Sequence, residues 1–420
     1  MKIKTIQAYE IIGSGGYPTV ECKVTLESGI SAVASVPYGA SAGSHEAIVL
    51  NDEDSGRYYG KGMLKAAANI NNIIAPEIVG MDANMQREID EKMLLLDGTE
   101  NKAKLGGNAI LVISLAVARS ASLEMKWPLY LYLKDYFHTS ETFEKLPNPM
   151  AVVIEGGKHA DDTTDLQEYS ISGMGETAPA ESIRQMLESY HKLAEVLKAN
   201  NLSINVGNEG AFAPNGIATN ESPFAFIIEA IEKAGYKPGI DLGISIDAAA
   251  SEYFKDGKYL LKIENKALSA DEISNYYETW LKKYPIITVE DMHAEDDWES
   301  WVKFKKICDA KNVTLIGDDL TVTNKKRLQQ ALDLNAISGI IIKLNQSGSL
   351  TETIDTCLLA KQHGIMNVSS HRGGGETNDT FMVDLAVAVG GKYIKVGPSR
   401  GERIAKYNRL LEIQRELKKS

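Results

Sequence analysis

The chain has 420 residues, of which 44% are hydrophobic and 24% are charged. This composition excludes disordered, collagen-like and disulfide-framework proteins and allows a sizeable core. The 45 lysines and arginines against 57 aspartates and glutamates give a formal net charge of −12. Nucleic acids and anionic membranes repel such a surface at long range, so neither is an expected partner. An anionic substrate must instead meet a local cluster of positive charge.

The cysteines and the apolar runs bear on where the protein works. Cys22, Cys308 and Cys357 lie far apart without metal-ligand spacing, so we expect buried thiols in a reducing compartment. The longest apolar run, residues 110–118, is much shorter than a membrane span and is interrupted by Ser114. The N-terminal residues alternate apolar and polar side chains, unlike a secretory signal. The simplest expected location is the cytoplasm.

Residues 1–138 are predicted to form a smaller α+β domain. Residues 1–12, 18–26 and 30–37 read as strands separated by turns, which predicts a three-stranded meander. From residue 60 the apolar period becomes helical. The predicted helices cover residues 63–76, 85–96, 108–125 and 129–137.

Residues 139–420 are predicted to form an α/β domain, a TIM-like barrel of eight strands. Short runs rich in Val and Ile alternate there with helical patterns. These runs are residues 150–154, 169–173, 242–248, 286–292, 314–319, 339–345, 367–371 and 393–397. Apolar content without polar alternation is typical of parallel strands that are buried on both faces. Eight such strands are the number that closes a TIM-like barrel.

Charged residues stand at or near the ends of six consecutive strands. They are Asp247, Glu290, Asp318, Lys343, His371 and Lys395. From Glu290 onward the separations are 24 to 28 residues, about one strand plus one helix. In a parallel barrel such side chains converge on the C-terminal face, where these folds place their active sites.

The three carboxylates of this set require a cation. One pair about 4 Å apart repels by about 4 kcal/mol at an effective dielectric constant of about 20. Because Asp247, Glu290 and Asp318 offer only oxygen ligands, Mg²⁺ is favoured over Zn²⁺. The alternative is a salt-bridge cluster with Lys343 and Lys395, which would not respond to chelation. Beside a dication both lysines should have depressed pKa values, which would let one act as a base.

Eleven stretches of the chain, in order, resemble the enolase family. They are PTVE at 18–21, VPYGASAG at 36–43 followed by His45-Glu46-Ala47, LGGNAILVISLAVARSAS at 105–122, GGKHA at 156–160 followed by LQEY, NVGNEGAFAPN at 205–215, ISIDAAASEY at 244–253, VEDMHAEDDWESW at 289–301, IGDDLTVTN at 316–324, IIKLNQSGSLTET at 341–353, SSHRGGGETNDT at 369–380 and IKVGPSRGERIAKYNRLL at 394–411. The resemblance implies a glycolytic lyase, a hydro-lyase that interconverts 2-phosphoglycerate and phosphoenolpyruvate. It also implies an antiparallel second barrel strand, which turns Glu168 towards the active face.

The resemblance assigns the proton-transfer roles and the first metal site. The three strand-end carboxylates would bind the first Mg²⁺, and Lys343 would remove the C2 proton of the substrate. Glu209 would protonate the departing C3 hydroxyl, with Glu168 beside it. A carboxyl near other carboxylates has a raised pKa, which suits an acid.

The resemblance also assigns the binding roles. Lys395 would face the substrate carboxylate, Arg372 and His159 the phosphate, and His371 the reacting end. Ser41 corresponds to the serine that joins a second, substrate-dependent Mg²⁺ when its loop closes. The family further implies a homo-oligomer, either a homodimer or an octamer.

Several residues depart from the family pattern. Gly15 stands in place of an arginine, Tyr38 in place of a serine, and Gly373 follows Arg372 in place of a serine, with one extra glycine after it. Glu155 replaces an asparagine. In the loop of Glu209, Asn208 and Ala211 replace Asp and Gly. Further along the chain, Met292-His293 replaces Pro-Phe. The hydroxyl missing at Gly373 costs a charged hydrogen bond, about 1.5–3 kcal/mol, unless a glycine N–H replaces it.

These departures leave two alternatives to an enolase. One is an enolase-like enzyme that forms an enolic intermediate from a related phosphorylated or phosphonate acid. The other is a non-catalytic paralogue, which the presence of Lys343, Glu209 and the three carboxylates disfavours.

Overall fold

The chain opens with three antiparallel strands, as predicted. The structure is a computed structural model that describes residues 1–39, 43–175 and 177–418. The strands are β1 (Ile3–Ile12), β2 (Pro18–Leu26) and β3 (Ser31–Ser35), in the order β1-β2-β3. Their side chains alternate between buried and exposed positions, because one face of the sheet packs against a helix and the other does not.

The predicted helices follow the sheet, with one change of boundary. They are α1 (Leu64–Asn69), α2 (Ala75–Ile78), α3 (Gln86–Asp97), α4 (Gly107–Glu124) and α5 (Leu129–Phe137). The prediction that the first helix ends at Pro76 was wrong, since α2 runs on to Ile78. A π-helical turn, Ile70–Ile74, precedes the proline, which occupies the first turn of α2, where a missing N–H is tolerated.

Helix α4 is the central helix of this first unit. Its 18 residues are long enough and apolar enough to cross a membrane, although the longest uninterrupted apolar run predicted from the sequence is much shorter. In the structure 83% of it is buried, and it packs against β2 and β3. It is therefore placed as a core helix.

Eight strands form the predicted closed barrel. They are β5 (Asn148–Glu155), β6 (Glu168–Gly173), β7 (Leu242–Asp247), β11 (Ile286–Glu290), β12 (Thr314–Gly317), β13 (Gly339–Ile342), β14 (Met366–Ser370) and β16 (Tyr393–Val396). The order around the ring is β11-β12-β13-β14-β16-β5-β6-β7. Only β6 runs antiparallel to its neighbours, β5 and β7, which confirms the expected antiparallel second strand.

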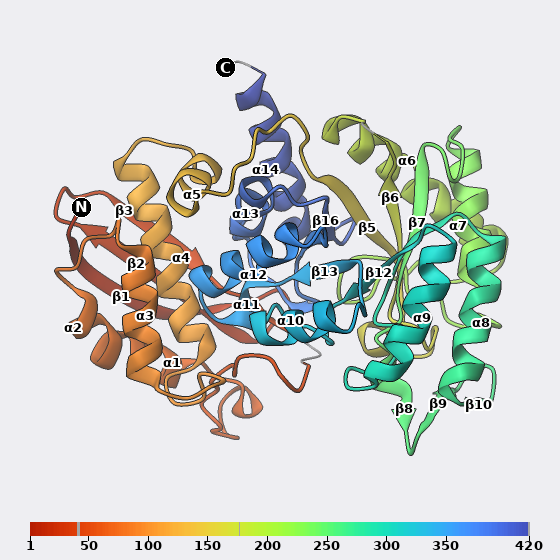
Figure 1. Cartoon of the computed structure of the whole chain (residues 1–420), viewed down its shortest axis with the longest axis horizontal. Coiled ribbons are helices and arrows are strands. Elements are labelled where there is room, and N and C mark those ends of the chain that lie inside the picture. The colour runs from red at the N-terminus through yellow and green to blue at the C-terminus, as the bar shows by residue number, and fades with distance from the viewer. Residues whose placement is uncertain (40–42, 176, 419–420) are drawn as a thin grey trace.

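Helices cover the outside of the barrel (Figure 1). They are α6 (Pro179–Ala199), α7 (Ser222–Lys233), α8 (Ala270–Lys283), α9 (Trp298–Ala310), α10 (Lys325–Asp333), α12 (Leu350–Gln362), α13 (Phe381–Val389) and α14 (Gly401–Leu417). The short helix α11 (Leu344–Ser347) lies instead at the barrel end, where Gln346 donates to Asp318 at 2.8 Å. Between β7 and α8 the chain forms a small sheet that the sequence did not predict. Its strands are β8 (Phe254–Lys255), β9 (Lys258–Leu261) and β10 (Lys266–Leu268), and it accounts for the long separation between Asp247 and Glu290.

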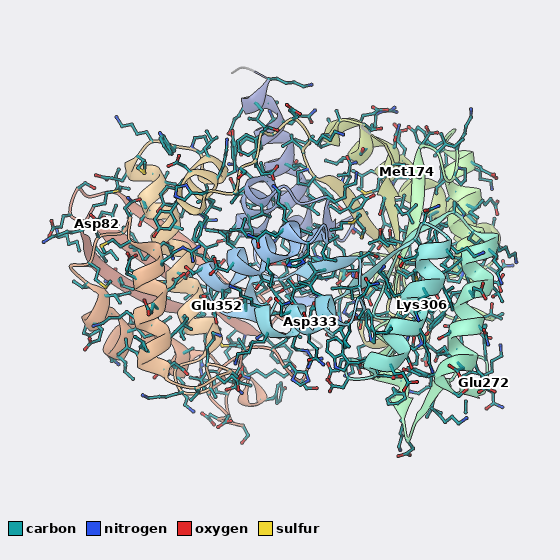
Figure 2. All side chains as sticks on the ribbon, in the orientation of Figure 1. Asp82, Met174, Glu272, Lys306, Asp333 and Glu352 are labelled. Atoms are coloured by element: carbon teal, nitrogen blue, oxygen red, sulfur yellow. The ribbon has the colours of Figure 1, made fainter. Side chains whose placement is uncertain are left out.

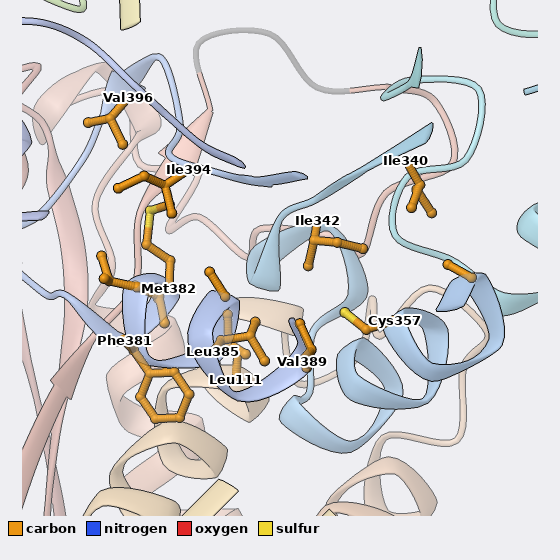
Figure 3. Close-up of a cluster of buried hydrophobic side chains, with 14 of the residues drawn as sticks. Leu111, Ile340, Ile342, Cys357, Phe381, Met382, Leu385, Val389, Ile394 and Val396 are labelled. Carbon is orange, nitrogen blue, oxygen red and sulfur yellow. The ribbon is translucent and has the colours of Figure 1, made fainter. Parts of the chain in front are cut away.

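The first unit and the barrel share one hydrophobic core. Figure 3 shows Leu111 of α4 beside Leu385 of α13, in the same cluster as strand residues of the barrel. Charged contacts flank this junction: Glu352 of α12, labelled in Figure 2, pairs with Lys102 at 3.1 Å. The junction fixes the loops of the first unit relative to the barrel end. The division at residues 138 and 139 stays a prediction.

Candidate active site

Three buried carboxylates meet at one end of the barrel. Asp247 and Glu290 are the last residues of β7 and β11, and Asp318 directly follows β12. These strands are neighbours in the ring, so their ends lie side by side. One oxygen from each carboxylate lies within 4.8 Å of the others. The predicted convergence is confirmed.

Two lysines neutralise this acidic cluster. Lys395 Nζ lies 3.0 Å from Asp247 Oδ2, 2.8 Å from Glu290 Oε2 and 2.8 Å from Glu168 Oε2. Lys343 pairs with Asp318. Burial lowers the pKa of both lysines, but the carboxylates raise it more, so both lie above the ordinary value. In this arrangement the ammonium groups themselves face the acids, and the depressed pKa values expected beside a bound dication stay a prediction.

The donor set fits Mg²⁺. It consists of buried carboxylate oxygens, and burial together with the Asp247 charge raises the pKa of Glu290 well above its usual range. Because ionising all three carboxylates is costly, a bound dication would stabilise their charged forms. The same contacts also fit the salt-bridge alternative, so a response to added metal separates the two.

A second acidic group supports this end of the barrel. Asp291, directly after Glu290, accepts hydrogen bonds from the N–H groups of Asp318 and Asp319 at 3.0 and 2.7 Å. This role of Asp291 was not predicted from the sequence. Paired acids at two strand ends, Glu290-Asp291 and Asp318-Asp319, were the available signal.

The predicted acid, Glu209, lies among buried polar groups. His371 Nε2 is 3.3 Å from Glu209 Oε1, and His159 Nδ1 is 3.5 Å from both Glu209 Oε1 and Glu168 Oε1. Among the described residues, Glu209 Oε2 and His371 Nδ1 are buried without a hydrogen-bond partner. Unsatisfied buried polar atoms are costly, so these groups are suited to a polar ligand.

The pKa values of the two carboxyls of this pair, Glu168 and Glu209, shift in opposite directions. Burial and the Glu209 charge raise the pKa of Glu168 well above its usual value. Burial raises the pKa of Glu209 too, but the charges of His371 and His159 offset it and leave this pKa below its ordinary value, contrary to the prediction. Because burial lowers the pKa of His371 to about 4, that offset holds only while its ring carries a proton. A neutral ring returns Glu209 towards the predicted raised pKa.

The predicted phosphate side is only partly open. Arg372 is buried, and its Nη1 donates to both oxygens of Glu46 at 2.9 Å. Next to it, a Cβ on Gly373 would lie 2.6 Å from His159 Nε2, so a serine does not fit there in this arrangement. Ser41, predicted as a ligand of a second Mg²⁺, lies outside the described residues.

Three departures from the family pattern pack together as one unit. Strand β4 (Tyr38–Gly39) pairs antiparallel with β15 (Gly374–Gly375). A Cβ on Gly375 would lie 2.3 Å from the Tyr38 ring, and one on Gly15 would lie 2.8 Å from Gly374 O and 3.2 Å from Tyr38 Oη. The tyrosine therefore needs the glycines. We call Gly15, Tyr38 and Gly374–Gly375 the rim.

A cavity of about 370 Å³ borders the rim. Its lining includes Lys61 and Arg372, which supply local positive charge of the kind expected for an anionic substrate, together with Glu46, the partner of Arg372. A larger cavity of about 830 Å³ lies near Asn148, at the start of β5, and its lining contains none of the predicted site residues. The smaller cavity is lined by Arg372 but by none of the strand-end acids and lysines, so it marks only the predicted phosphate side of the site.

A role for Glu155 was also not predicted from the sequence. This residue stood out only as a departure from the family pattern. In the structure its side chain is fully buried at the end of β5 and accepts a hydrogen bond from the loop that carries Glu209. Its position at a strand end, before Gly156-Gly157, was a usable signal.

The fold and the site together define an α/β-barrel protein with an N-terminal α+β unit and a buried cluster of acids and lysines at one barrel end. Comparison with known families agrees. Residues 3–133 match the family model described as the N-terminal domain of enolase, and residues 143–420 match its C-terminal TIM barrel domain. The chain belongs to the enolase family.

Proposed function

We propose that the protein is a Mg²⁺-dependent enolase, a hydro-lyase that interconverts 2-phosphoglycerate and phosphoenolpyruvate. The observation that carries the proposal is the arrangement of the barrel end. Three adjacent strand ends present Asp247, Glu290 and Asp318, and the next strand presents Lys343. Glu209 and Glu168 lie beside His159, away from Lys343 in the ring order.

The base and the acid are supplied from opposite sides of the barrel. Lys343 follows β13, which is four strands from β6 in the ring of eight, and β6 begins with Glu168. Lys343 would take the C2 proton on its side. Mg²⁺, when bound by the three carboxylates, supplies positive charge that stabilises the negative charge developing on the substrate carboxylate.

The remaining residues would orient the substrate and complete the elimination. Glu209 would give a proton to the C3 hydroxyl, which otherwise leaves poorly. Lys395 would hold the substrate carboxylate. Arg372 would bind the phosphate, and for this it must share or exchange its contact with Glu46.

An absorbance assay tests the proposal. Purified protein with Mg²⁺ should form phosphoenolpyruvate from 2-phosphoglycerate, and EDTA should abolish the reaction. Glu209→Gln should lower dehydration by about 100-fold or more while leaving measurable exchange of the C2 hydrogen, because different residues move the two protons. The C2 exchange is followed by NMR in deuterated water. Equal loss of both activities in Glu209→Gln would remove Glu209 from the acid role.

One observation favours a second candidate function. The rim and Gly373 differ from the family pattern where the phosphate is expected, so an enolase-like enzyme could act on a related phosphorylated or phosphonate acid. In that case the protein should exchange the C2 hydrogen of 2-phosphoglycerate yet produce no phosphoenolpyruvate.

The remaining proposals follow from the family resemblance. We propose that the enzyme works in glycolysis in the cytoplasm and binds a second Mg²⁺ with the substrate. We also propose that it assembles as a homodimer or an octamer and binds neither nucleic acid nor membrane.

A further inference from the structure

The loop that carries Glu209, residues 207–211, is held by side chains from other elements. Its carbonyl groups accept hydrogen bonds from four of them, one of which is Arg403, whose Nη2 donates to Asn208 O at 3.3 Å. Tyr190 Oη and Ser399 Oγ donate to Gly210 O at 2.8 and 2.7 Å. Arg400 Nη2 donates to Gly207 O at 2.6 Å. These contacts restrain the loop from the outer side of the barrel.

On the inner side, Glu155 holds the N–H groups of the same loop. The N–H of Glu209 donates to both carboxyl oxygens of Glu155, at 3.2 and 3.1 Å, and the N–H of Ala211 donates to Oε1 at 3.1 Å. The loop also packs closely on this carboxyl, since a Cβ on Gly207 would lie 2.5 Å from Glu155 Cδ. Glu155 thus supports the loop through three backbone hydrogen bonds and close packing.

The position of this carboxyl is costly and rigid. Glu155 ends β5, is fully buried and lies opposite Glu168 in the barrel sheet. Within the described residues, no lysine or arginine forms an ion pair with it, and the charge of Arg400 only partly offsets its burial. Burial and the nearby Glu209 charge raise its pKa to about 8. The family pattern has an asparagine here, and an amide would avoid this electrostatic cost. The carboxyl of this chain offers two acceptor oxygens instead of one, and both accept hydrogen bonds from the loop.

We propose that Glu155 is a positioning residue for the acid step, because its carboxyl fixes the backbone at Glu209 and Ala211 and thereby aims the Glu209 side chain into the site. This inference rests on the proposed function of Glu209 as the acid. Lys343 follows β13, and among the described residues its donated hydrogen bonds and ion pair go to Asp318 and Thr323 rather than to the 207–211 loop, so the C2 proton transfer should not depend on Glu155.

Two variants test the proposal. Glu155→Asn withdraws the side chain by one methylene, and Glu155→Gln keeps its length and one acceptor oxygen. In Glu155→Asn, formation of phosphoenolpyruvate should fall about 10- to 100-fold, while exchange of the C2 hydrogen of 2-phosphoglycerate stays within about 2-fold. Glu155→Gln should show a smaller loss. A merely structural role would lower both activities in the same ratio and overturn the proposal.

A second readout does not depend on activity. Deuterium uptake of the 205–213 segment, measured by mass spectrometry, should rise in Glu155→Asn, while uptake of 286–290 stays unchanged. Glu264→Gln is the matched control, because this half-buried carboxylate also accepts a backbone N–H, that of Asn220 at 3.0 Å, away from the loop. It should change neither readout. Unchanged uptake at 205–213 in Glu155→Asn overturns the positioning role.

The two readouts separate the failure of this inference from that of the proposed function. If the wild type neither forms phosphoenolpyruvate nor exchanges the C2 hydrogen, the proposed function fails, whereas the deuterium uptake still decides whether Glu155 holds the loop.

Discussion

His293 is a buried histidine inside a cage of aromatic rings. The rings of Tyr259, Tyr277 and Phe304 have centroids 5.8, 6.4 and 5.3 Å from the imidazole. Its Nε2 lies 2.9 Å from Ser274 Oγ. Burial lowers the pKa of His293 to about 4. The family pattern has a phenylalanine at this position, which explains why the surroundings are aromatic.

This burial makes stability depend on pH in a defined window. Between about pH 6.5 and 4 the unfolded chain binds a proton at His293 that the folded protein does not. The free energy of unfolding should therefore fall as the pH drops, by about 1.4 kcal/mol per pH unit within that window. His293→Phe should remove this contribution, as measured by urea unfolding at pH 7, 5.5 and 4.5.

Replacing His293 does not leave a buried hydroxyl without a partner, so the comparison with wild type isolates the imidazole. Ser274 also donates to Ala270 O at 2.8 Å, so removing the imidazole leaves its hydroxyl with a partner. If the unfolding free energies of the wild type and His293→Phe run parallel across the three pH values, the histidine is already protonated in the folded protein and the prediction is wrong.

At the level of single residues, the sequence predicted those that stand at strand ends. Asp247, Glu290 and Asp318 converge because regular alternation of strands and helices fixes their place. Glu155 and the Arg372–Glu46 pair were not predicted. Their partners lie tens to hundreds of residues away in the chain, and such contacts depend on how loops fold, which periodicity does not report.

At the level of elements, the sequence predicted the long and strongly periodic ones. All eight barrel strands and the first three strands were found, because their Val and Ile runs are distinct. The two-residue strands β4 and β15 were not, since two residues carry no period. The antiparallel direction of β6 came from the family resemblance, and the position of Glu168 at the start of its strand was the only local sign.

The rim makes a prediction about the pair of strands β4 and β15. A Cβ on Gly375 would lie 2.3 Å from the Tyr38 ring and 2.7 Å from Tyr38 O. Gly375→Ala should therefore lower the free energy of unfolding by about 1–3 kcal/mol through overpacking, measured by urea unfolding. It should also raise the KM for the substrate, because Tyr38 borders the cavity that Arg372 lines.

Two further variants make the rim prediction specific. Adding Tyr38→Ser to Gly375→Ala should recover part of the lost stability, because the ring is the closer obstacle. Gly401→Ala is the matched control, since nothing lies within 4 Å of a Cβ there. An equal loss in both single variants would mean that the glycine backbone, rather than the tyrosine contact, matters.

At the scale of the whole molecule, the first unit and the barrel are joined through buried contacts of both kinds. The core is continuous from α4 into α13 and the barrel strands (Figure 3). Asp90 of α3 accepts hydrogen bonds from the N–H and hydroxyl of Thr351 on α12, at 3.0 and 2.6 Å. Arg119 of α4 donates to both oxygens of Asp379 at 2.8 Å. Such a junction should make the two units unfold together.

Leu111→Ala tests this coupling. Leu111 is fully buried on α4 beside Leu385 of α13, so its truncation should lower the free energy of unfolding by about 2–5 kcal/mol. Because the core is shared, deuterium uptake should rise in both β2 and β16, and urea unfolding should remain a single transition. Leu123→Ala, on the same helix but 47% exposed, is the control and should change little. A rise confined to residues before 138 would mean that the first unit unfolds alone, and the loops that approach the barrel end could then open without disturbing the acids and lysines.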